Sequence, residues 1–212
     1  MPLTPKTRTI LLAAIPVLAV VCAVFIFRIP PDAKLGAMVR FVMFHGASTW
    51  VNMGTFTLAG IAGVAYALGF APLGRWGEAF RWISLPLWIV NTVLGILSMK
   101  LLWGGILWSE PRLKMTFGLL AGAMVILAVQ FLFDHPKVPA LLDALLAASL
   151  WVLVLVLPNL FHPDSPVFSS GDPSYIIGFL GMVVSLAAIA GVITVLIARR
   201  AHPEHPHAHA LP

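Results

Sequence analysis

Six long apolar runs, separated by short segments rich in proline and glycine, constrain this 212-residue chain more than any other feature. The hydrocarbon core of a bilayer is about 30 Å thick, and a helix needs about 20 apolar residues to cross it. The runs lie at about residues 9–27, 35–70, 83–102, 113–133, 138–160 and 175–198. The spacing predicts an all-α, polytopic membrane helix bundle with six transmembrane helices.

Composition supports this fold class, because 60% of the residues are hydrophobic and only 10% are charged. Soluble domains average about 25% charged residues. We expect residues 1–200 to form one six-helix transmembrane domain, and residues 201–212 to form a disordered tail rich in His and Pro. An even number of crossings places both termini on one side, which we take as cytoplasmic in a multi-pass protein of the cytoplasmic (inner) membrane.

Several protein classes are excluded by what the chain lacks. It has a single cysteine, Cys22, so neither an intramolecular disulfide nor a Cys-based zinc site can form. No CxxCH segment is present, which excludes covalent c-type haem. Basic residues form no stripe of the kind that binds nucleic acid. No nucleophile–base motif or phosphate-binding glycine loop occurs, so we expect no bond-changing catalysis.

Polar residues gather on the side opposite the termini. His45 lies in the outer half of the second run, and His162 lies in the loop after the fifth. At helical spacing, His45 shares a face with Phe41, Ser48, Thr49 and Asn52. Four cations sit at or inside the outer ends of helices, where a positive charge needs an anion: Arg40, Lys100, Arg112 and Lys114.

This combination is typical of a haem site. Two neutral imidazoles can ligate one iron axially, and Arg and Lys pair with propionates. His45, His162, an aromatic loop from Trp103 to Lys114 and the outer cations therefore suit a haem better than a zinc ion. No third nitrogen or sulfur ligand is placed for zinc.

Each of these residues also has a simpler interpretation. An intramembrane histidine such as His45 can form a hydrogen bond between helices, and His162 can be a solvated turn residue. Trp103 and Trp108 can anchor the bundle at the lipid interface. Arg112 and Lys114 can extend to the headgroups. Asp143 can pair with Lys137 at its helix end or mark a proton path.

Two segments resemble a known family. The segment from Trp103 to Leu113, with Gly104, Glu110 and Arg112 in register, resembles the Trp-rich WWD loop of haem-handling proteins in cytochrome c assembly. The segment from Phe44 to Trp50 resembles the motif of that family's second helix. The six-helix layout resembles the short CcmC-like members. The loop is degenerate, because Ile106, Leu107 and Ser109 stand where the family has aromatic residues.

The resemblance implies haem b binding at the outer, periplasmic face, and delivery of that haem during cytochrome c maturation. It implies His45 and His162 as the axial ligands of the haem iron, and Glu110 as the acidic residue of the loop. With this resemblance, we expect Arg40, Arg112 and Lys114 to hold the propionates, and Trp50, Trp103 and Trp108 to line the pocket. A haem chaperone and ABC-transporter subunits would be the partners. The alternative is a b-type haem or haem-free membrane subunit of a respiratory electron-transfer complex. A single intramembrane histidine, His45, argues against two stacked haems in such a subunit.

Overall fold

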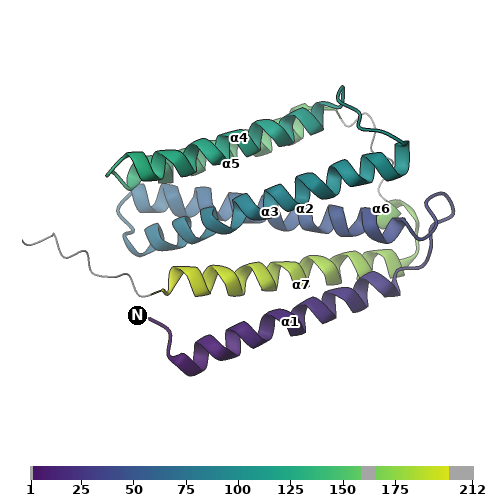
Figure 1. Cartoon of the computed structure of the whole chain (residues 1–212), viewed down its shortest axis with the longest axis horizontal. Helices are drawn as coiled ribbons and strands as arrows, with labels where there is room; N and C mark the ends of the chain where they lie inside the picture. Colours follow the sequence, from purple (N-terminus) through teal and green to yellow (C-terminus); the bar gives the residue numbers. More distant parts are fainter. Residues whose placement is uncertain (1, 159–165, 201–212) are drawn as a thin grey trace, which may run out of the picture.

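The computed structural model describes residues 2–158 and 166–200, and its regular elements within these ranges are helices (Figure 1). The predicted ligand His162 and the predicted tail lie outside the described residues. Six helices are long and one, α6, has four residues. The elements are α1 (Pro5–Arg28), α2 (Val39–Ala67), α3 (Pro72–Trp103), α4 (Pro111–Leu132), α5 (Lys137–Val156), α6 (Pro166–Ser169) and α7 (Pro173–Ala198).

The long helices run side by side along one axis (Figure 1). The start of α1, the end of α7 and the start of α3 lie at the same end of the bundle (Figure 1). Arg81 lies in the first third of α3. We name this the Arg81 end. The opposite end carries the start of α2, the end of α3 and the start of α4, and we name it the His45 end.

Five helices, α1, α3, α4, α5 and α7, are long and apolar enough to cross a membrane, which makes the chain a multi-pass integral membrane protein. The sixth long helix, α2, does not meet that criterion. It packs against α3, α5 and α7 in the interior of the bundle. Its buried face carries Asn52 and Thr55, and this polar content lowers its hydropathy. Neighbouring helices rather than lipid surround that face.

Helix boundaries differ from the sequence prediction mainly in α3. The helix begins at Pro72 rather than near residue 83. The proline and glycine after Ala71 predicted a turn there, but Pro72 is well placed in a first helical turn, and Arg81 finds partners on neighbouring helices. The second helix begins at 39 rather than 35, because Asp32 accepts the N–H groups of Lys34 and Leu35 in a turn. These two bonds also lower the pKa of Asp32.

Glycines on one side of α2 let α5 approach closely. A Cβ at Gly60 would lie 2.8 Å from Cβ of Ala147, and a Cβ at Gly63 would collide with the carbonyl of Ala140. Such small-residue contacts are the usual means by which membrane helices pack. α1 packs chiefly on α7, around a buried cluster that includes Cys22, Phe179 and Met182. The remaining four long helices, α2 to α5, surround the candidate site described next.

Candidate functional site

A cavity of about 550 Å³ lies toward the His45 end, between α2, α3, α4 and α5. Ligand pockets in proteins commonly measure about 300–1,000 Å³. Four of the predicted site residues line it: His45, Trp50, Trp103 and Arg112. Its remaining wall is mostly apolar, with a few polar groups. We name it the His45 cavity.

His45 enters the cavity from α2, where it is half-buried. The sequence predicted that His45, Ser48 and Thr49 share one face of α2. The structure confirms this, because Ser48 and Thr49 lie one turn after His45 and both contact Asn91 of α3. Their hydroxyls donate to Oδ1 of Asn91 at 2.7 and 3.0 Å. These bonds tie α2 to α3 directly beside the histidine.

Arg112 reaches the cavity from the first turn of α4. Glu110 caps that helix by accepting the backbone N–H of Arg112 at 3.3 Å, which fixes where the helix begins. The guanidinium donates to the carbonyl of Val154 at a long 3.4 Å. Its buried Nε has no hydrogen-bond partner among the described residues. A half-buried cation whose Nε lacks a partner favours an anionic ligand.

Four tryptophans line the cavity, namely Trp50, Trp88, Trp103 and Trp151, and two of them were predicted site residues. Trp103 ends α3, and Trp50 projects from α2 with half of its surface exposed. Trp50 also packs edge-on against Phe179 of α7, at 5.3 Å between ring centroids. The aromatic wall therefore continues from the cavity toward α7.

Four other predicted site residues lie outside the cavity lining. Arg40 donates from Nε to the carbonyl of Ile29, which joins the end of α1 to α2. Trp108 is exposed and stacks on Phe117 at 6.2 Å. Glu110 is fully buried at the cap of α4, and Lys114 is exposed on α4. The structure thus brings together His45, Trp50, Trp103 and Arg112, and does not add these four to them.

Sequence reasoning missed the wall contributed by α3. Asn91, Thr92, Gly95 and Ser98 line the cavity from that helix. Their signal was present, because polar and small residues recur at helical spacing inside an otherwise apolar run. Trp88 lies deeper on the same face, and its indole N–H donates to the carbonyl of Thr116 at 2.9 Å.

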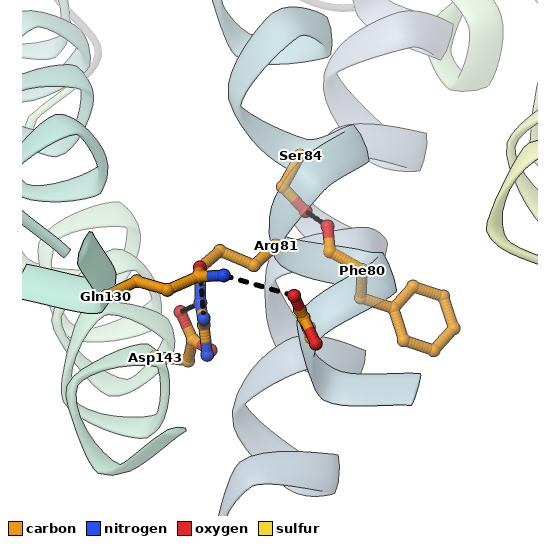
Figure 2. Close-up of polar contacts among 6 residues, drawn as sticks. Phe80, Arg81, Ser84, Gln130 and Asp143 are labelled. Atoms are coloured by element: carbon orange, nitrogen blue, oxygen red, sulfur yellow. Dashed lines mark hydrogen bonds and ion pairs between the residues drawn. The ribbon is translucent and has the colours of Figure 1, made fainter. Parts of the chain in front are cut away.

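A second polar centre lies at the Arg81 end (Figure 2). The guanidinium of Arg81 forms two short bonds with the carboxylate of Asp143, at 2.6 Å from Nη2 and 2.9 Å from Nε. It also donates to Oε1 of Gln130 at 2.7 Å, and Gln130 donates to Glu78 at 3.1 Å. These four residues, which we name the Arg81 network, link α3, α4 and α5.

The Arg81 network is almost closed to solvent at its centre. Arg81 is 9% exposed and Asp143 is 5% exposed. Asp143 pairs across the bundle with Arg81 and not with Lys137. The Lys137 ammonium instead donates to the carbonyl of Ala67. A cavity of about 580 Å³ adjoins the network, lined in part by Tyr66, Glu78 and Asp134. With its donors engaged, Arg81 has the geometry of a structural ion pair.

The described residues contain no group of three or more His, Cys, Asp or Glu side chains arranged to hold a metal ion. Comparison of the sequence with models of known protein families gave no match, and comparison with curated proteins gave none either.

Proposed function

We propose that this chain binds haem b in the His45 cavity and hands it on at the outer face of the cytoplasmic membrane, as a CcmC-like haem handler in cytochrome c maturation. One observation carries the proposal. A histidine and an incompletely bonded arginine line the same aromatic-framed cavity from different helices. An imidazole and a guanidinium are the groups that hold the iron and the propionates of a haem.

The residues present fit such a group. His45 would hold the iron, Arg112 would pair with a propionate, and Trp50 and Trp103 would cover the ring. His162 is proposed as the second axial ligand. Bound haem would supply an iron that imidazole nitrogens can hold. The chain itself would bind, orient and release the haem, without changing a bond.

The proposal includes a topology and partners. All six long helices cross the membrane, both termini face the cytoplasm, and the His45 end faces outward. A periplasmic haem chaperone would accept the haem, and ABC-transporter subunits would assist its release. Arg40, Lys114 and Trp108 lie toward the same end of the bundle and would contribute to the surface that meets the chaperone. The buried Glu110 would fix the start of α4 there.

The decisive test is spectroscopic. The detergent-purified protein, expressed with haem supplied, should show a b-type spectrum when oxidised and when reduced with dithionite. A pyridine haemochrome assay should give about one haem per chain, since one cavity carries the ligand set. Absence of haem under these conditions would refute the proposal. Rapid reduction of the haem by a quinol would instead support an electron-transfer subunit.

Variants locate the site. His45→Ala should abolish most haem binding, and His162→Ala should lower it. Arg112→Ala should weaken retention less than loss of a ligand does. His135→Ala and Arg75→Ala are matched controls, because both residues lie at the Arg81 end and outside the His45 cavity. Haem occupancy equal to wild type in both ligand variants would show that the ligand assignment is wrong.

A further inference from the structure

Gly95 lies in the interior of α3, where glycine destabilises a helix by about 0.5–1 kcal/mol relative to alanine. Its backbone does not require glycine, because positive φ in the described glycines is confined to Gly36, Gly69, Gly104 and Gly171. What distinguishes Gly95 is the side chain that a Cβ at this position would meet.

The space beside Gly95 is filled by the side chain of His45. A Cβ at Gly95 would lie 3.2 Å from Cε1 and 3.4 Å from Nε2 of His45, and no other neighbour approaches within 4 Å. The first distance is tighter than most Cβ contacts, so the imidazole would have to shift by a few tenths of an ångström. Gly60 and Gly63 differ, because they make room for atoms of the neighbouring helix α5. Gly95 makes room for the imidazole edge that carries Nε2.

Hydrogen bonds between α2 and α3 oppose a movement of α2 that would carry the His45 imidazole away from position 95. Asn91 lies one turn before Gly95 and accepts the hydroxyls of Ser48 and Thr49, one turn after His45. These hydrogen bonds hold α2 and α3 at a set separation beside the histidine. A side chain at position 95 would therefore turn the imidazole within the cavity rather than push the helices apart.

We propose that Gly95 is a positioning residue that sets the orientation of the His45 imidazole in the cavity. Its missing Cβ leaves the Nε2 edge against the backbone of α3. This inference rests on the proposed function only insofar as His45 is a haem ligand. Groups that orient a ligating histidine typically change metal affinity by about 10- to 100-fold when they are altered.

The test compares Gly95→Ala with Gly77→Ala, measuring the haem dissociation constant, the reduced visible spectrum and the electron paramagnetic resonance of the oxidised protein. Both glycines lie in α3, but a Cβ at Gly77 would make only ordinary contacts, 3.5 Å or more. Both variants should gain helix propensity. Gly95→Ala alone should bind haem about tenfold more weakly and show altered spectra. Values for Gly95→Ala that match those of Gly77→Ala would overturn the proposal.

A haem-free measurement separates this inference from the proposed function. Diethylpyrocarbonate modifies accessible imidazoles, and peptide mass spectrometry reports the rate at His45 and His135 separately. Gly95→Ala should change the rate at His45 and leave the rate at His135 as in wild type. An unchanged His45 rate in the haem-free protein would refute the positioning role. Altered His45 reactivity in a chain that binds no haem would uphold it, and would refute only the haem assignment.

Discussion

Two arginines occupy opposite ends of the same four-helix group, and their surroundings differ. Arg81 forms a double hydrogen bond with a carboxylate and a third bond with Gln130. Arg112 has one long bond to a carbonyl, and its Nε lacks a partner among the described residues. A guanidinium whose donors are matched stabilises a fold, whereas one with donors to spare is prepared for a ligand.

Contacts between the helices add to this comparison. At the Arg81 end, Gly63 brings α2 against the backbone of α5, and the Arg81 network joins α3, α4 and α5. A cavity adjoins each end, of about 550 Å³ beside His45 and about 580 Å³ beside the Arg81 network, so the ends differ in how their polar groups are bonded and not in empty space. The comparison indicates that the bonded Arg81 end supplies rigidity and that the His45 end supplies groups for binding. Each of the following predictions tests that division.

The largest effect is expected from breaking the buried ion pair. Asp143→Ala or Arg81→Ala should lower the free energy of unfolding by about 3–5 kcal/mol, because each leaves a buried charge without its partner. Unfolding in mixed micelles of increasing dodecyl sulfate content would measure the loss. The double variant Arg81→Met/Asp143→Leu should recover much of it, since neither charge remains. Single variants as stable as wild type would contradict a structural role for the Arg81 network.

The second prediction compares two glycines on α2. Gly63→Ala should destabilise the bundle by about 1–3 kcal/mol, because its Cβ would collide with the carbonyl of Ala140. Gly54→Ala should stabilise it by up to about 1 kcal/mol, because that Cβ would meet open space and alanine favours the helix. The same unfolding assay applies. Equal losses in the two variants would show that the bundle is packed as tightly around the His45 cavity as at the Arg81 end.

The sequence predicted the helices well because the length needed to cross a bilayer is a local property of the chain. It also predicted that His45 shares its face with Ser48 and Thr49, since helical spacing places residues three and four apart together. Fold class and local faces need no knowledge of which helices are neighbours. The five apolar spans confirm a helical membrane bundle at this coarser level.

Pairings between helices could not be predicted in this way. Arg81 and Asp143 are 62 positions apart, and their contact depends on how α3 and α5 pack. Arg40 stands at a helix end as the sequence suggests, yet its guanidinium binds the carbonyl of Ile29. In the sequence Gly95 cannot be distinguished from other helix glycines, because its contact with the His45 imidazole is formed only in the folded bundle. Each of these contacts depends on tertiary structure, which a single sequence does not reveal.

The smallest effect on the free energy of unfolding is expected from substitution of Arg112 in the haem-free protein. This result would test the contrast between Arg112 and Arg81 most directly. Arg112→Met keeps a straight side chain and removes a charge that has little to bond with, so stability should stay within about 1 kcal/mol of wild type. Adding hemin at 100 times its dissociation constant should stabilise wild type by about 2.7 kcal/mol. The variant should gain less at the same concentration, because its affinity is lower. A haem-free loss as large as that of Arg81→Ala would make Arg112 a second structural arginine, and the contrast between the two ends would fail.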